Sequence, residues 1–175
     1  MIGRQVWVTP PSGIRFAKRG VFDISKTYQA IRSFLLDHHY SLRNFQEKEN
    51  TSRRRPEEFG EVIFILQTAK EVDDYARFHI NVDVRINKLR KVVVGEMTMD
   101  EGFFQVYIIG YVFLDYRNKW QRSSFSAMLS KIYNNYLIKN KIENEYQGPL
   151  FGEVCGLRDA VKESLDLYPY YHGNV

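Results

Sequence analysis

The chain of 175 residues has a single cysteine, five prolines and no long apolar run. Cys155 cannot form an internal disulfide, so packing and hydrogen bonds must stabilise the fold, as in a reducing compartment. No stretch approaches the roughly 18 apolar residues of a membrane-spanning helix, and the N-terminus lacks the apolar segment of a secretion signal. We therefore expect a cytoplasmic, intracellular protein without a membrane span.

Locally encoded catalytic motifs are also missing. The chain contains no GxSxG, GxxxxGK[ST] or GxGxxG, and no HxxxH or CxxC pair that would supply two metal ligands at once. His38 and His39 are neighbours and point in different directions on a helix, so they do not form such a pair. The sequence favours a non-enzymatic protein that has no cofactor and no metal site.

A β pattern dominates the middle of the chain, from Glu61 to Tyr116. Between Phe78 and Ile86 apolar and polar residues alternate without a break, which is typical of a strand with one buried face. Residues 62–66 and 103–114 are apolar on both faces, which places them inside the sheet, or beneath helices on one side and a partner on the other. Residues 4–9 are either an edge strand or a loose arm, and we predict further strands at 41–47 and 92–94, with turns at Asn87–Lys88 and Asp100–Gly102.

Helical patterns flank this sheet. A helix is expected to begin at Asp23, with Asp23 or Ser25 as its cap, and to bury a stripe that contains Ile24, Tyr28, Ile31 and Leu35. A second is expected over 123–136, and a third follows Gly148–Pro149. The prediction is an α+β fold: an antiparallel sheet of about five strands packed by amphipathic helices. Residues 1–22 form a basic arm, 23–168 a single domain and 169–175 a tail.

The order of these elements, a helix, a meander of strands and a long C-terminal helix, resembles that of helix-grip folds. The resemblance implies a cavity between sheet and helix in which a small apolar ligand binds. Five aromatic residues would line such a cavity: Tyr107, Tyr111, Phe113, Tyr133 and Tyr136. A ligand-binding protein or enzyme of this type is therefore the alternative to a binding module without a pocket.

Charge is distributed unevenly along the chain. Residues 1–55 contain 11 Lys and Arg against 4 Asp and Glu, whereas residues 56–116 contain 6 against 11. A basic segment suggests an anionic partner such as nucleic acid, or an acidic protein surface, and equally it can face the acidic part within one fold or between copies. The acidic middle third argues against the sheet itself as an RNA platform.

The candidate contact residues are the cations of the basic segments, with aromatic residues between them. They are Arg15, Lys18, Arg19, Arg53, Arg54, Arg55, Arg117 and Lys119. The polar strand face with His79, Asp83 and Arg85 is either a further site or an ordinary solvated face. We expect a binding or assembly module that contacts nucleic acid or an acidic protein surface through these basic segments, with homo-oligomerisation as a further possibility.

Overall fold

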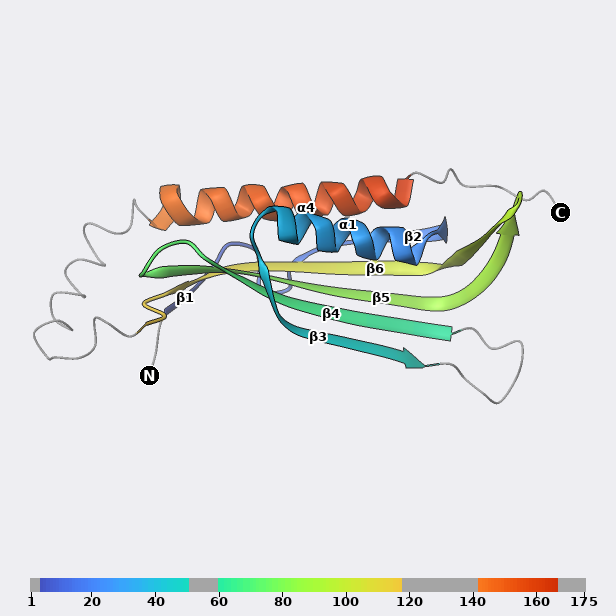
Figure 1. Cartoon of the computed structure of the whole chain (residues 1–175), viewed down its shortest axis with the longest axis horizontal. Helices are drawn as coiled ribbons and strands as arrows, with labels where there is room; N and C mark the ends of the chain where they lie inside the picture. Colours follow the sequence, from blue (N-terminus) through green and yellow to red (C-terminus); the bar gives the residue numbers. More distant parts are fainter. Residues whose placement is uncertain (1–3, 51–59, 118–141, 167–175) are drawn as a thin grey trace, which may run out of the picture.

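The computed structural model describes the backbone of residues 4–50, 60–117 and 142–166, with side chains over 4–43, 60–117 and 142–165. Six strands form one antiparallel sheet, and two helices lie on one side of it (Figure 1). This arrangement confirms the predicted α+β class. The strands are β1 (Arg4–Trp7), β2 (Ile14–Phe22), β3 (Ser41–Asn50), β4 (Gly60–Glu71), β5 (Ala76–Val94) and β6 (Met97–Leu114).

The sheet combines a four-stranded meander with two strands from the start of the chain. β3, β4, β5 and β6 follow one another in space, and β1 and β2 both pair with the outer edge of β6. Pro10 and Pro11 separate β1 from β2, because proline has no amide hydrogen to donate to β6. Gly13 turns the chain back to the edge with φ of 74°, and a Cβ there would lie 2.9 Å from the Ile108 carbonyl oxygen.

The first helix, α1 (Ile24–Asp37), begins where the sequence predicted. The Asp23 carboxylate accepts a hydrogen bond from the Lys26 backbone amide at 3.0 Å and so caps the first turn. Ile31 and Leu35 of the predicted stripe are buried, and Tyr28 packs at the margin of the core. The helix ends at Asp37, where an imidazole nitrogen of His38 lies 2.9 Å from the Phe34 carbonyl oxygen.

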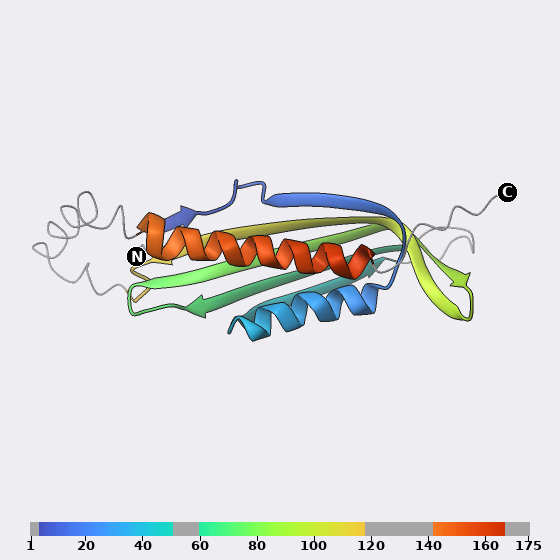
Figure 2. The ribbon, with the colours of Figure 1, turned by 90° about the horizontal axis from the view of Figure 1, so that it is seen from above.

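The second described helix, α4 (Gly148–Asp166), follows a π-helical turn, η2 (Ile142–Gln147), and runs along the sheet beside α1 (Figure 2). Its buried stripe consists of Leu150, Val154, Leu157, Val161 and Leu165. Gly110 of β6 allows this close contact, because a Cβ there would lie 2.7 Å from Val154 Cγ2.

The core fills the layer between the sheet and these two helices. Every second residue of β5 from Ala76 to Ile86 is buried, as is every second residue of β6 from Phe104 to Leu114. Successive strand side chains point to opposite faces, so the residues between them lie on the face away from α1 and α4.

Two predicted turns are wrong. β5 runs without interruption from Ala76 to Val94, and the hairpin turn lies at Gly95–Glu96 rather than at Asn87–Lys88. Asp100–Gly102 lies inside β6, paired on both sides. Asn87–Lys88 is instead the position of a β-bulge. Between the pairs Asn87–Phe103 and Arg90–Glu101, β5 advances by three residues and β6 by two.

Other expectations fall outside the described residues or shift at their ends. The predicted helix over 123–136 lies outside the described residues, as do Arg53, Arg54, Arg55 and Lys119. β3 continues to Asn50, three residues beyond the predicted end of that strand.

Candidate binding surface

One face of the sheet has no described helix or strand packed on it, and we call it the open face (Figure 1). It is formed by the side chains that alternate with the core residues of β1, β2, β4, β5 and β6. These side chains are mostly half-buried, because their neighbours on adjacent strands shield them from water without covering them. The open face is therefore a continuous surface that the described residues offer to a partner.

Three aromatic residues of β6 follow one another along the open face at intervals of four. Phe103, Tyr107 and Tyr111 lie about 13 Å apart along the strand, and each has a distinct partner on the edge strand. Arg19 is opposite Phe103, Arg15 is opposite Tyr107 and Trp7 is opposite Tyr111. Two arginines and a tryptophan thus run parallel to a row of aromatic rings.

The far end of this row is a stack of rings from three strands. The His79 ring on β5 is parallel to the Tyr111 ring, with centroids 4.7 Å apart and an interplanar angle of 4°. On the other side the Trp7 ring lies 5.5 Å from the Tyr111 ring, and 43% of Trp7 is exposed. The partly exposed indole of Trp7 therefore lies beside the stacked rings of Tyr111 and His79.

Burial, together with the positive charges of Arg77 and Arg43, lowers the pKa of His79 to about 4. His79 is therefore neutral at pH 7. A neutral ring packed against Tyr111 is a poor general acid at that pH, so it acts here as a flat surface and not as a proton donor.

The acidic residues of the middle third do not give the open face an acidic character. Asp83 forms an ion pair with Arg85 at 2.7 Å, and Glu101 forms one with Arg90 at 2.5 Å, so these two carboxylates are each neutralised by an arginine. Asp73 and Asp74 lie in the turn between β4 and β5, at one end of the sheet. The positions of these side chains therefore weaken the argument, based on total charge, against the sheet as a binding platform for nucleic acid.

Cations without an ion-pair partner among the described residues remain on this face. Arg15 and Arg19 of β2 are exposed and have no such partner, and neither does Lys88 of β5. The guanidinium of Arg85, although paired with Asp83, also lies 5.6 Å from the centre of the Tyr107 ring. The open face thus combines flat rings with available positive charge.

The structure separates the predicted contact residues that it describes. Arg15 and Arg19 share the open face. Lys18 points to the helix side, where its Nζ donates to the Leu165 carbonyl oxygen at 2.8 Å near the end of α4. Arg117 lies at the far end of β6 and pairs with Asp74 at 2.5 Å, so it belongs to the turn there.

The aromatic residues expected to line a cavity between sheet and helices lie elsewhere. Tyr107, Tyr111 and Phe113 are on the open face, opposite the helices, and Tyr133 and Tyr136 lie outside the described residues. A hollow of about 430 Å³ does occur between α1 and β4, and its mixed lining includes Tyr28, Arg32 and Phe64.

Within the described residues, no group of three or more His, Cys, Asp and Glu side chains converges as metal ligands would. In the same part of the chain no helix is long and apolar enough to cross a membrane. Comparison of the chain with protein-family models, with curated proteins and with solved structures found no match in any of the three. Its function must therefore be argued from the open face itself.

Sequence reasoning missed Lys88 as a surface residue and assigned Tyr111 to an interior cavity, and it named Trp7 only as an aromatic residue between the basic contact residues. One signal was available: β6 is apolar at successive positions, which indicated helices on one side and a partner on the other. The pairing of Trp7 with Tyr111 carries no such signal, because 104 positions separate these residues in the chain and only the strand order brings them together.

Proposed function

We propose that the protein is a non-enzymatic binding module whose open face binds single-stranded nucleic acid. One observation carries the proposal: a row of aromatic rings on β6 lies beside Arg15 and Arg19, which have no carboxylate partner among the described residues. Bases stack on aromatic side chains, and arginines neutralise the phosphates that connect them.

The geometry suits a strand rather than a compact ligand. From Phe103 to Tyr111 the row extends over about 27 Å, and for comparison OB folds that bind single strands contact about 4–16 nucleotides. The face is built from regular strands, so the rings are held in place before binding and little ordering is required. A duplex is a poorer fit, because its bases are already stacked on one another.

The proposal is tested by fluorescence anisotropy with labelled RNA and DNA single strands of about 12 nucleotides. Changing Trp7 to Ala should weaken binding about 5- to 150-fold, the usual effect of losing one stacking residue. The matched control is Phe151→Ala on α4, since Phe151 is 48% exposed and lies on the helix side. Equal weakening in both variants would refute a role for the open face.

The charge component has its own control. Arg15→Gln should reduce the dependence of the logarithm of affinity on the logarithm of salt concentration by about 0.7, whereas Arg32→Gln on the exposed surface of α1 should leave it unchanged. The variant with Arg53, Arg54 and Arg55 changed to Ala tests whether the segment after β3 contributes to the same binding. If the unmodified protein binds neither strand at low salt, an acidic protein surface or a second copy becomes the better partner.

A small apolar ligand remains a second candidate, supported by the hollow between α1 and β4. Thermal denaturation in the presence of a panel of fatty acids and aromatic metabolites tests it, because a ligand that binds only the folded state raises the melting temperature. Stabilisation that is abolished by Tyr28→Ala and retained in Trp7→Ala would assign ligand binding to the hollow and not to the open face.

A further inference from the structure

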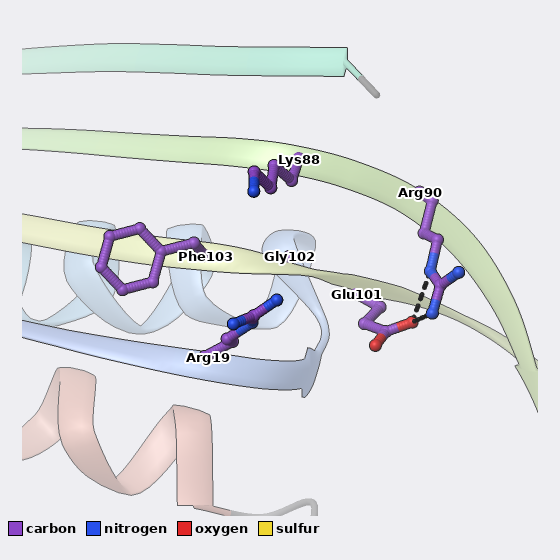
Figure 3. A pocket seen from close by; sticks show the side chains of 6 residues that line it. All are labelled: Arg19, Lys88, Arg90, Glu101, Gly102 and Phe103. Atoms are coloured by element: carbon purple, nitrogen blue, oxygen red, sulfur yellow. Dashed lines mark hydrogen bonds and ion pairs between the residues drawn. The ribbon is translucent and has the colours of Figure 1, made fainter. Parts of the chain in front are cut away.

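A small pocket opens at the end of the open face that lies opposite the Trp7 stack. It has a volume of about 150 Å³ and is lined by Arg19, Lys88, Arg90, Glu101, Gly102 and Phe103 (Figure 3). A neighbouring hollow of about 260 Å³ shares Arg19, Lys88 and Phe103 with it. The two hollows therefore form one recess with the same cationic lining.

The recess has an excess of positive charge. Of its four charged residues three are cations, and the single carboxylate, Glu101, is held by Arg90, whose Nε lies 2.6 Å and Nη2 2.5 Å from the same oxygen. Arg19 and Lys88 have no ion-pair partner among the described residues. They come from β2 and β5, on the two sides of Phe103, and so face the recess from opposite sides.

The β-bulge in β5 creates this arrangement. The extra residue brings Asn87 and Arg90 to the same face, because both are paired with open-face residues of β6. Lys88 itself has φ of 56°, a left-handed conformation that is unusual for a lysine. At this point the strands are tightly apposed, since a Cβ on Gly102 would lie 3.0 Å from the Asn87 carbonyl oxygen.

We propose that this recess binds a phosphate group, with Arg19 and Lys88 as its ligands. Arginine offers a fork of N–H donors and lysine a compact charge, a combination that suits the oxygens of a phosphate. The inference rests on the proposed function where the phosphate belongs to a bound strand. The site itself requires only the phosphate, so free inorganic phosphate is the other source of the same chemistry.

The site is tested first with inorganic phosphate, by NMR of the backbone amides at constant ionic strength. Phosphate should shift the amides of Lys88, Gly102 and Phe103, and chloride at equal ionic strength should not. The double variant with Arg19→Gln and Lys88→Asn should weaken phosphate binding at least about tenfold. Asparagine tolerates the left-handed conformation at position 88, so the bulge is retained while the charge is lost.

A control variant and a measurement of single-strand binding distinguish failure of the phosphate site from failure of the proposed function. Lys26→Gln removes an exposed charge from α1 and should leave the phosphate shifts intact. Identical shifts with chloride, or unchanged shifts in the double variant, would overturn the site. If phosphate binds as expected but no single strand does, the site stands and the proposed function fails. If single strands bind the unmodified protein but inorganic phosphate does not shift its amides at the recess, the function stands and the site fails.

Discussion

The two faces of the sheet are built from the same strands, yet their side chains differ in burial and in polarity. On the helix side β5 and β6 present side chains that are almost all fully buried, and the Phe22 and Phe104 rings meet there edge to face at 5.5 Å. On the open face the intervening residues are half-buried aromatic and charged groups, and β2 contributes two arginines that have no ion-pair partner among the described residues. The first face stabilises the fold, and the second offers contacts that the described part of the chain does not use.

Truncation of one aromatic residue on each face should separate these roles most strongly. Phe104→Ala removes a fully buried ring and should reduce the free energy of unfolding by about 3–5 kcal/mol. Tyr107→Ala, three positions later and on the open face, should cost about 1 kcal/mol, because its ring is only half-buried. Denaturation in urea measures both. Equal losses would mean that the open face is covered in solution, for example by a second copy.

Two consecutive residues of β2 provide a finer comparison. Lys18 faces the helix side and donates to the Leu165 carbonyl oxygen, so Lys18→Met should reduce stability by about 1 kcal/mol. Arg19 faces the recess, and Arg19→Gln should change stability by less than about 0.5 kcal/mol while weakening phosphate binding. If the stability losses were reversed, the assignment of these two residues to opposite faces would be wrong.

The smallest expected effect concerns pH, through His79 on the open face. Its pKa is lowered from 6.5 to about 4 in the folded protein, so between these values the unfolded chain takes up a proton that the folded chain does not. Stability should therefore fall as the pH falls from 6.5 to 4. The loss is limited because solvent reaches part of the ring.

The pH effect is measured by urea denaturation at pH 7, 5.5 and 4.5. His79→Gln should flatten the pH dependence, and His39→Asn is the control, since His39 is exposed with φ of 63°, which asparagine accepts. An unchanged slope in His79→Gln would show that other groups cause the acid sensitivity.

Much of the fold could be predicted from local patterns. Strand alternation from Phe78 to Ile86 and the cap at Asp23 were sufficient for the α+β class, because both are encoded within a few residues. The bulge at Lys88 was misread as a turn: Asn-Lys followed by a new apolar run has the composition of a hairpin, and only pairing with β6 reveals a continuous strand.

The candidate surface was harder to predict than the fold. Arg15 and Arg19 could be named from composition, but Lys18 between them appeared equivalent, and only strand alternation in a known sheet assigns it to the other face. The acidic middle third was judged by its total charge. That total hides the pairing of Asp83 with Arg85 and of Glu101 with Arg90, which depends on positions and not on composition.

The hairpin between β5 and β6 extends past the strands on either side of it. β4 pairs with β5 only as far as Leu89, and β2 pairs with β6 only as far as Asp100, so among the described residues the ribbon beyond these positions has no third strand. A two-stranded ribbon is marginally stable by itself, and we expect its amides to exchange with solvent faster than those of the central sheet. The ribbon begins at Val92, two residues after Arg90, whose partner Glu101 still pairs with Val21 of β2, so opening of the ribbon would reach the edge of the phosphate recess while Arg19 stays fixed on the body of the sheet.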